Sequence, residues 1–467
     1  MIQILQHEKV DVLSKYKSII EEVDTIHFTG KVERIVGLTI ESHGPEVQYG
    51  ELCKIKIGEG EYLWAEVVGF NKNKVILMPI GEMKGVVPGA EVFAAGTSLM
   101  VPVGNKLLGR VLDGTGKPLD GKPEMYSSEK YPVNGEPLKP LQRGIIDKPL
   151  STGIRAIDGL NTIGKGQRIG IFSGSGVGKS TVIAMIARNT AADVNVIALI
   201  GERGREAKDF VERELGEKGL KKSVVIIATS DQPPMLRMRG AFLAHSVAEY
   251  FRDQGLHVNL LMDSVTRFAM AQREIGIAAG EPASTRGYPA SVFSILPRML
   301  ERAGNKEGSG SITGFYSILV EADDMNEPIA DAVRGILDGH VVLNRKLAHK
   351  GHYPAIDVLE SISRCMKDVI DDEHKQAAVD FRELLAAYAN VEDLITLDAY
   401  VRGTNPVADR AIDMKPEMDA YLKQGIYEDD SFQNIRNRLV QLMGRGEQTL
   451  EVKQDYVTPA PYFARRR

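Results

Sequence analysis

The sequence predicts an α/β protein of three parts: a small N-terminal β-barrel, a central domain with a mostly parallel sheet, and a C-terminal helical domain. Short β-branched runs separated by glycines between Ile26 and Val103 indicate the barrel. From about residue 151 to residue 366, aliphatic runs alternate with helical stretches, which is typical of a parallel sheet covered on both faces. Beyond residue 367 no convincing strand follows, and the pattern is helical.

Composition limits the classes of protein to which the chain can belong. Its 467 residues suffice for about three domains, and 43% hydrophobic with 26% charged residues is ordinary for a globular protein. The 58 Lys and Arg against 63 Asp and Glu leave a net charge of −5, which argues against wholesale coating of nucleic acid. Cys53 and Cys365 are too far apart for a CxxC metal site, and we expect a reducing, cytosolic setting. No apolar run approaches the roughly 20 residues that a membrane-spanning helix needs.

The N-terminal third divides where its pattern changes. Residues 1–24 carry an apolar stripe at helical spacing, which predicts a helix packed on its own domain or docked on a partner protein. Residues 25–103 form the expected barrel, and the Gly- and Pro-rich residues 104–150 are expected to connect it to the central domain. The expected barrel strands are Lys31–Ile40, Leu52–Ile57, Leu63–Phe70 and Lys74–Pro79.

The remaining chain divides into a central domain at 151–366, a helical domain at 367–446 and a tail of unknown role at 447–467. In the central domain the expected strands are Arg168–Phe172, Val194–Ile200, Val224–Thr229, Val258–Met262 and Tyr316–Val320. Its clearest helices are Lys179–Asn189 and Met238–Asp253, and those of the helical domain are His374–Ala389 and Asp430–Met443.

The strongest motif is a glycine-rich loop between a strand and a helix. Its glycines let backbone N–H groups cradle phosphate oxygens, Lys179 would reach the β- and γ-phosphates, and the Ser180 hydroxyl would bind Mg²⁺. The strict pattern has Gly where this chain has Ser173, and an ordinary glycine-rich turn is the alternative. The predicted nucleotide-binding residues are Ser173, Gly174, Ser175, Gly176, Val177, Gly178, Lys179, Ser180 and Thr181.

Two carboxylates follow neighbouring strand candidates and are candidates for the chemistry. Glu202 comes directly after Val194–Ile200 and Gly201, where it would polarise an attacking water as general base, or else lie in an Arg-paired surface loop. Asp263 ends the aliphatic run Val258–Met262, where it would hold Mg²⁺ through water, or else cap the following helix.

At this point the sequence resembles a known family. Gly153-Ile-Arg-Ala-Ile-Asp158, the glycine-rich loop, Gly201-Glu-Arg-Gly-Arg205 and Asp263-Ser-Val-Thr-Arg-Phe-Ala-Met-Ala-Gln-Arg273 are similar to segments of the catalytic subunits of rotary ATPases, and more so of the type III secretion ATPases. Gly287–Phe293 and Ser361–Cys365 extend the resemblance, which covers about residues 28–443. Within the family, Gly37–Glu41 and the N-terminal segment resemble the flagellar export ATPase most. The resemblance implies a RecA-like P-loop ATPase domain at 151–366.

The resemblance also implies roles for individual residues. Glu202 matches the residue that activates the hydrolytic water, and Arg203 matches a residue near the γ-phosphate. Tyr353 matches an aromatic side chain that stacks on adenine, and Arg364 matches an arginine finger that enters the neighbouring subunit's site. Without the resemblance, Tyr353 would be a turn aromatic and Arg364 a surface ion-pair residue.

The function implied is Mg²⁺-dependent ATP hydrolysis by a homohexameric ring that energises protein export through a flagellar type III secretion apparatus. The implied partners are a regulatory or stator protein at the N-terminal helix, export chaperones and substrates, and a membrane export gate reached through partner proteins. The implied location is cytoplasmic, peripherally associated with the inner face of the cell membrane.

Three alternatives stay open at this stage. The injectisome, or virulence, secretion ATPase is closely similar in sequence. A non-catalytic nucleotide-binding subunit of a rotary ATPase is less favoured, because those subunits resemble this chain but lack the glutamate matched by Glu202. A nucleic-acid translocase is disfavoured, because its barrel would need stacking aromatics and basic residues, whereas residues 26–103 have few aromatics and many acidic residues.

Overall fold

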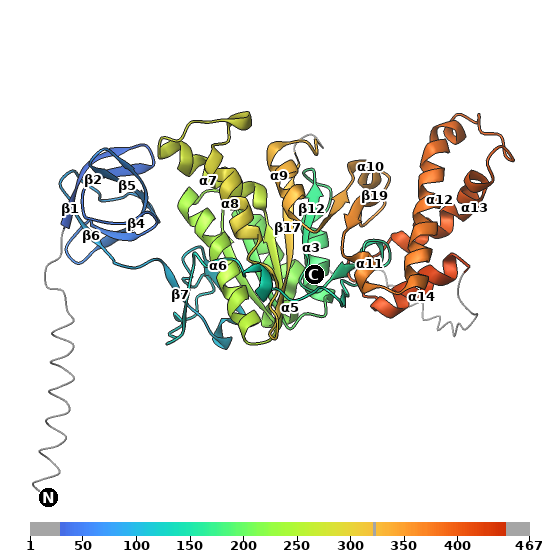
Figure 1. The fold of residues 1–467 in the computed structure, drawn as a ribbon, viewed down its shortest axis with the longest axis horizontal. Coiled ribbons are helices and arrows are strands. Elements are labelled where there is room, and N and C mark those ends of the chain that lie inside the picture. The colour runs from blue at the N-terminus through green and yellow to red at the C-terminus, as the bar shows by residue number, and fades with distance from the viewer. Residues whose placement is uncertain (1–28, 321–323, 445–467) are drawn as a thin grey trace, which may run out of the picture.

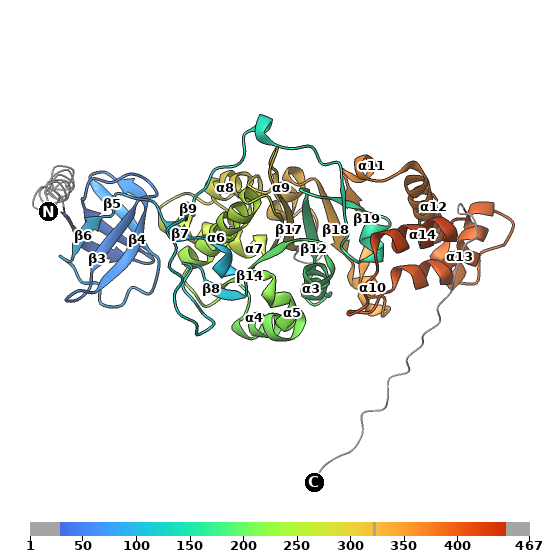
Figure 2. The ribbon, with the colours of Figure 1, turned by 90° about the horizontal axis from the view of Figure 1, so that it is seen from below.

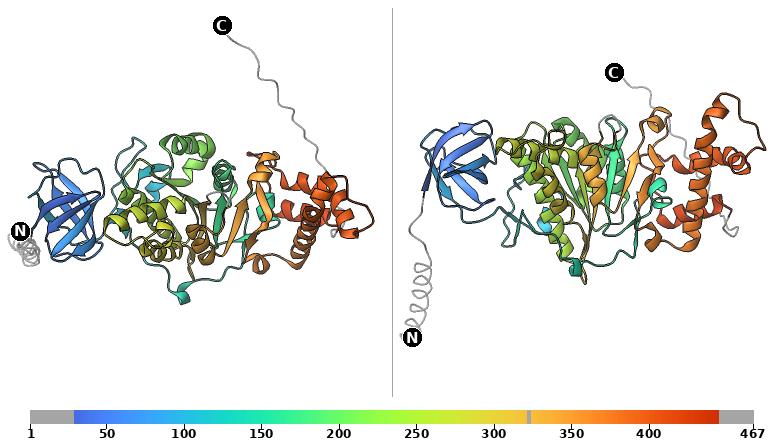
Figure 3. Two further views of the ribbon diagram at one scale, coloured as in Figure 1. Left: turned by 90° about the horizontal axis from the view of Figure 1, so that it is seen from above. Right: turned by 45° about the horizontal axis from the view of Figure 1, so that its top comes forward.

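The computed structural model describes residues 29–320 and 324–444 and places three bodies along its long axis (Figure 1). A closed β-barrel lies at one end, a large sheet covered by helices occupies the middle, and a group of helices lies at the other end. The two views in Figure 3 show the same order from other directions. This arrangement confirms the predicted fold class. The predicted helix at 1–24 and the tail at 447–467 lie outside the described residues.

Six antiparallel strands close the N-terminal barrel in the order β1-β2-β5-β4-β3-β6. Ile40, Ile55 and Leu77 are fully buried in its core. The single run expected at Lys31–Ile40 is two strands, because Gly37 takes a left-handed φ of 58° and turns the chain. The barrel strands are β1 (Thr29–Val36), β2 (Thr39–His43), β3 (Leu52–Lys56), β4 (Tyr62–Asn71), β5 (Lys74–Pro79) and β6 (Glu91–Ala94).

A nine-stranded sheet forms the middle of the molecule, in the order β19-β18-β12-β17-β15-β13-β14-β8 with β16 paired to β17 outside this path. From β18 to β8 every neighbouring pair is parallel, and only β19 and β16 run antiparallel to their partners. The parallel strands therefore end at one common edge. The strands are β8 (Arg110–Asp113), β12 (Arg168–Ser173), β13 (Val194–Ile200), β14 (Ser223–Ala228), β15 (His257–Asp263), β16 (Gly304–Asn305), β17 (Ser311–Leu319), β18 (Gly339–Leu343) and β19 (Ile356–Ser363).

Helices cover both faces of this sheet (Figure 2). Successive side chains of β13 point to opposite sides, so Val196 and Ala198 pack into one core with α6 to α9, and Ile197 and Leu199 into another with α3 to η3. The helix expected at Met238–Asp253 begins earlier, at Pro234. The helices are α3 (Lys179–Asn189), α4 (Gly204–Asp209), η3 (Phe210–Leu215), α5 (Gly216–Lys221), α6 (Pro234–Asp253), α7 (Val265–Ala278), η4 (Thr285–Gly287), α8 (Ala290–Leu300) and α9 (Pro328–Ile336).

The segment at residues 104–150 does more than connect the barrel to the sheet. Its strand β8 pairs in parallel with β14 and forms one edge of the large sheet. No local pattern indicates this, because the partner strand lies more than a hundred residues later in the chain. The short elements in and around this segment are β7 (Met100–Pro102), η1 (Asn105–Leu107), β9 (Lys130–Pro132), η2 (Pro140–Gln142), β10 (Pro149–Leu150), α2 (Arg155–Asp158) and β11 (Ile163–Gly164).

The C-terminal helices pack on the central domain beside β19. Phe381 and Tyr421 bring two of them together with ring centroids 5.6 Å apart, and the buried Arg155 of α2 pairs with Glu428. Across the described ranges, no helix is long and apolar enough to cross a membrane. The elements are α10 (Arg345–His349), α11 (Met366–Val369), α12 (Asp372–Thr396), α13 (Pro406–Leu422) and α14 (Phe432–Leu442).

A buried ion pair joins α6 to the chain that follows α8. The guanidinium of Arg302 is fully buried and donates to both carboxylate oxygens of Glu249 at 2.8 and 2.6 Å. It also donates to the Ser246 hydroxyl and to the Val133 carbonyl, both at 2.9 Å. The pair therefore also anchors the segment that follows the barrel.

We expect Glu249→Ala to destabilise the central domain by about 3–5 kcal/mol, because it leaves the Arg302 charge buried without its partner. Unfolding in guanidinium chloride, followed by circular dichroism, measures this loss of stability as a shift in the midpoint concentration of the denaturant. The double variant Arg302→Met with Glu249→Leu is the matched control and should recover most of the loss, because it removes both charges. A single variant as stable as wild type would contradict the prediction.

Candidate active site

The glycine-rich loop joins β12 to α3, as the sequence predicts. Gly176 and Gly178 have φ values of 78° and 99°, in the left-handed region that favours glycine. A Cβ atom at either position would meet nothing within 4 Å, so backbone conformation rather than crowding requires glycine there. Ser173 is the last residue of β12, where ordinary extended backbone suits any residue, and this explains why the departure from the strict pattern is tolerated.

Lys179, at the start of α3, is the common cation of two carboxylates. Its Nζ atom lies 2.5 Å from Asp263 Oδ1 and 3.6 Å from Glu202 Oε1. The three side chains are between 5 and 18% exposed. The parallel register explains the meeting, because β13 and β15 are neighbours and Leu199 pairs with Asp263. The structure thus brings together three residues that the sequence proposes for the site.

Glu202, the predicted general base, lies at the turn that follows β13. Its backbone carbonyl accepts a hydrogen bond of 3.0 Å from the Ser230 N–H, and Gly201 before it turns the chain with a φ of 72°. Burial and the nearby charge of Asp263 raise the pKa of Glu202 to about 7, against the opposing effect of Lys179. Among the described residues, its Oε1 has no hydrogen-bond partner. A buried carboxylate with a pKa near neutrality suits proton transfer.

Asp263 ends β15 and does not cap the following helix. The cap of α7 is Ser264, whose hydroxyl accepts from the Arg267 N–H at 3.4 Å. The carboxylate of Asp263 instead faces the site, where Oδ1 accepts hydrogen bonds from Lys179 and from the Ser317 hydroxyl at 2.7 Å. Both donors use one oxygen, which leaves Oδ2 for another ligand.

Sequence reasoning missed Ser317. It lies in β17, between the loop strand β12 and the Asp263 strand β15, and its side chain is fully buried. The signal is tertiary, because only the register of β15 against β17 places Ser317 beside Asp263. A serine in an aliphatic strand has no spacing that distinguishes it beforehand.

The other residues of the loop surround this cluster. Ser180 is exposed on the first turn of α3, and Val177 is buried under the loop. Gly174 is buried, Gly178 and Thr181 are partly buried, and Ser175 and Gly176 are exposed.

Arg203 and Tyr353 are not in contact with the cluster. The side chain of Arg203 is 82% exposed and lies 3.4 Å from Glu206 on the same helix turn. Tyr353 is 49% exposed in the loop between α10 and β19, and its carbonyl accepts from the Gln424 N–H at 2.9 Å. Their assigned roles stay predictions.

Arg364 lies at the opposite edge of the sheet from the loop of its own chain. It follows Ser363, which pairs with Gly339 at the start of β18, whereas Leu343 at the end of β18 lies beside Ser173. The two ends of β18 are four residue steps apart, which is about 13 Å along a strand. The Arg364 side chain is exposed and makes no hydrogen bond or ion pair with the residues that the structure describes. It therefore does not contact the loop of its own chain, and its role as an arginine finger stays a prediction.

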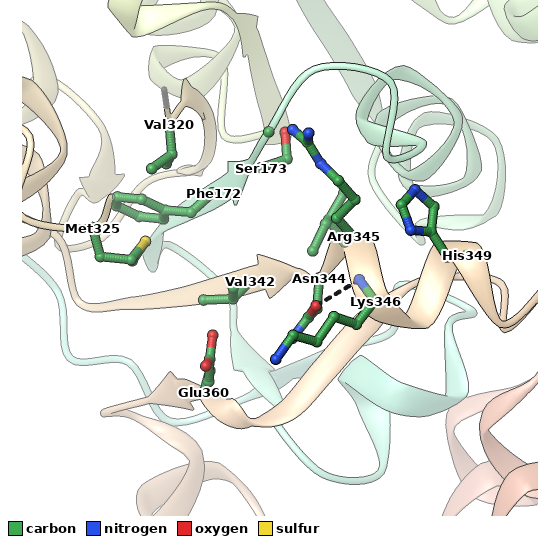
Figure 4. Close-up of a pocket in the computed structure, with 12 residues that line it drawn as sticks. Phe172, Ser173, Val320, Met325, Val342, Asn344, Arg345, Lys346, His349 and Glu360 are labelled. Atoms are coloured by element: carbon green, nitrogen blue, oxygen red, sulfur yellow. Dashed lines mark hydrogen bonds between the residues drawn. The ribbon is translucent and has the colours of Figure 1, made fainter. Parts of the chain in front are cut away.

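A cavity of about 330 Å³ lies beside the first residue of the loop (Figure 4). Phe172 and Val342 form its apolar wall, and the Ser173 hydroxyl and the Arg345 guanidinium lie close together on its other side. The Ser173 hydroxyl is buried and has no hydrogen-bond partner within the described part of the chain. The cavity connects the loop with α10, the helix that precedes Tyr353.

Family profiles match all three bodies of the molecule. Residues 153–363 match the nucleotide-binding domain of the ATP synthase alpha/beta family, and residues 32–96 match the β-barrel domain of the same family. Residues 370–441 match the C-terminal domain described as T3SS EscN ATPase.

Characterised relatives are similar along almost their whole length. The Flagellum-specific ATP synthase of Bacillus subtilis (strain 168) is 53% identical over 92% of this chain and 98% of its own. The Type 3 secretion system ATPase of Xanthomonas euvesicatoria is 50% identical over 87% of this chain and 92% of its own. Among solved structures, the assembled ATPase EscN from the enteropathogenic E. coli type III secretion system has a TM-score of 0.84 at 44% identity, covering 89% of this chain and all of that one.

A phosphate-binding loop next to a buried Lys–Asp–Glu cluster, on a sheet of this order, defines a P-loop ATPase of the ATP synthase alpha/beta kind. The three profile matches, together with relatives that are similar along most of their length, identify the family more narrowly. The chain belongs to the family of flagellar and type III secretion ATPases.

If Glu202 is the predicted general base, we expect kcat/KM for ATP to fall about tenfold per pH unit below a pKa of about 7 and to level off above it, because a carboxylate accepts a proton only when it is ionised. Raised pH removes the proton, so activity rises with pH through this value. ATPase assays between pH 5 and pH 8.5 measure the profile, and binding of a fluorescent ATP analogue over the same range controls for affinity. A profile that is flat down to pH 5 would show that burial does not raise this pKa.

Proposed function

We propose that this chain energises protein export through a flagellar type III secretion apparatus, as the ATP-hydrolysing subunit of a homohexameric ring. The observation that best supports hydrolysis is that Glu202 lies beside Asp263 and beside Lys179, the residue that follows the phosphate-binding loop. The flagellar assignment is supported by relatives named Flagellum-specific ATP synthase at 53% and 51% identity. The injectisome alternative is supported by Type 3 secretion system ATPases at 50% and 48%.

The reaction is in-line attack of water on the γ-phosphate of ATP. In our proposal Glu202 takes the proton of the attacking water, which its pKa near 7 allows at neutral pH. Lys179 exchanges its contact with Asp263 for the β- and γ-phosphates, so that one cation serves the carboxylates and then the substrate. Arg203 is exposed one residue after Glu202, from where it turns toward the γ-phosphate.

The residues present fit a Mg²⁺ ion that arrives with the nucleotide. Ser180 offers an exposed hydroxyl, and Asp263 offers the oxygen that its two donors leave unused. No group of three or more His, Cys, Asp or Glu residues within 29–320 and 324–444 is placed to hold a metal by protein ligands alone. This suits Mg²⁺, which keeps waters and phosphate oxygens as ligands. When bound, the ion neutralises charge on the transferring phosphoryl group.

The arginine finger acts between subunits in this proposal. Arg364 lies at the far edge of the sheet from its own loop and is free to reach a neighbouring chain. Such fingers are worth about 10³–10⁵ in rate in comparable phosphoryl-transfer systems. A ring of six copies supplies each loop with one finger, and the assembled state of the similar EscN ATPase supports this arrangement.

We expect Glu202→Gln and Arg364→Ala each to bind ATP with little turnover, and an equimolar mixture of the two to recover part of the wild-type rate. In the mixture, some interfaces pair an intact Glu202 of one chain with an intact Arg364 of another. Steady-state ATPase activity across protein concentration, for wild type, each variant and the mixture, measures this. Wild-type turnover per subunit that stays flat on dilution, or a mixture no more active than its parts, would argue against a shared site.

The partners and location follow the same proposal. An assembled neighbour, EscN in complex with its central stalk EscO at 43% identity, supports a stalk protein as one partner. Exposed Ile426 and Tyr427, between α13 and α14, suit contact with export chaperones or substrates. We propose a cytoplasmic ring held at the inner face of the membrane through an export gate and a regulator bound by residues 1–24.

The flagellar role is tested in Bacillus subtilis cells that lack their own flagellum-specific ATP synthase. We expect this chain to restore part of the swimming motility, because it is 53% identical over nearly all of that protein. The Glu202→Gln variant, expressed at the same level, is the control and should not restore it. Lack of motility with an expressed, ATP-hydrolysing chain would favour the injectisome alternative.

A further inference from the structure

Two aliphatic side chains stand out on the segment that leads into the central domain. We call residues 140–148 the strap. Its Leu141 and Ile145 are 92% and 86% exposed, more than any other leucine, isoleucine or valine side chain among the described residues. Single exposed apolar residues are common, but two within five residues that are both almost fully exposed indicate a contact site.

Hydrogen bonds hold the backbone of the strap against the central domain. Arg143, between them, donates to the Ala303 carbonyl at 3.1 Å and to the Glu301 carboxylate at 2.8 Å. The Gly144 N–H donates to the Asn305 carbonyl at 3.1 Å, and the Asn305 side chain donates to the Ile145 carbonyl at 3.0 Å. Because the backbone is already ordered, binding a partner costs little further conformational entropy.

A chain of contacts connects the strap to the arginine finger. Glu301, which holds Arg143, also pairs with Arg168 at the start of β12. Arg168 donates to both oxygens of Asp338 at 2.9 and 3.0 Å, and the Asp338 carbonyl accepts from the Arg364 N–H at 3.0 Å. The strap and Arg364 therefore lie at the same edge of the sheet. In Figure 2 the strap, drawn in teal, stands out from the central domain on the side where α11 lies.

We propose that Leu141 and Ile145 dock on a second copy of this chain, as the apolar anchor of the interface through which Arg364 reaches the neighbouring phosphate-binding loop. We infer a second copy as the partner because the strap lies next to Arg364, and Arg364 is too far from the loop of its own chain to contact it. In this interface Arg364 would contribute its charge to the neighbouring site, and Leu141 and Ile145 would bury apolar surface on the neighbouring chain. Protein interfaces commonly combine a buried apolar centre with polar contacts around it. This inference rests on the shared-site ring proposed above.

The test is the double variant Leu141→Ser with Ile145→Ser in the full chain. We expect the protein concentration for half-maximal ATPase activity and for assembly, measured by sedimentation velocity, to rise about tenfold or more. The plateau rate at high concentration should stay that of wild type, because neither side chain touches the site. Leu397→Ser, 75% exposed between α12 and α13, is the matched control and should leave both midpoints unchanged.

The outcomes separate this inference from the ring itself. If wild-type turnover depends on concentration and the double variant behaves like Leu397→Ser, the ring stands and the strap has no part in it. If wild-type turnover is independent of concentration, the ring fails, and the strap inference fails with it. A lower plateau rate at full assembly would mean that the substitutions disturb the site rather than docking, which also overturns the inference.

A photo-crosslinking amino acid at position 141 gives a second, direct readout. With ATP present, we expect covalent pairs of this chain, joined to peptides near the neighbouring phosphate-binding loop. The same amino acid at position 397 is the control for random collision. Crosslinking confined to the chain's own segments, or equal at both positions, would refute docking on a second copy.

Discussion

The register of the parallel sheet is the constraint on which the rest of the molecule depends. Strands β12, β17, β15 and β13 are neighbours, so the phosphate-binding loop, Ser317, Asp263 and Glu202 arrive at one edge. A shift of one residue in any pair would turn its side chains to the other face. The buried aliphatic faces of these strands oppose such a shift, because each alternate residue belongs to a different core. Packing therefore positions the chemistry.

Electrostatics at that edge are balanced around one cation. Lys179 lies between two carboxylates that are mostly shielded from water, and it contacts Asp263 more closely than Glu202. Asp263 has Lys179 and Ser317 as donors, whereas Glu202 Oε1 has no hydrogen-bond partner within the described ranges. Burial, and then the nearby charge of Asp263, raise the pKa of Glu202 to about 7 against the opposing effect of Lys179. Two similar carboxylates are thereby suited to two roles, one as a fixed ligand and one as a proton acceptor.

The same sheet keeps two parts of the proposed machinery apart. Because β19 runs antiparallel to β18, the chain returns to the edge opposite the loop before it reaches Arg364. A single copy thus presents a loop at one edge and a finger at the other, which suits a head-to-tail ring closed by rotation. The segment that precedes the sheet reaches the same edge as Arg364 through Arg143 and Glu301. Residues 104–150 therefore link the barrel to the sheet, contribute strand β8 to it, and include the proposed contact surface.

The amino-acid sequence by itself determined the local elements and the identity of the chemistry. Glycine spacing indicated the loop, and largely aliphatic runs indicated β13 and β15 with a carboxylate at or just beyond the end of each, because these signals lie within about ten residues. Only the tertiary structure decided which strands are neighbours. It placed Ser317 on Asp263, added β8 to the sheet edge, and set Arg364 opposite the loop. These depend on pairing between residues tens to hundreds of positions apart, and such pairing leaves no periodic trace in a single sequence.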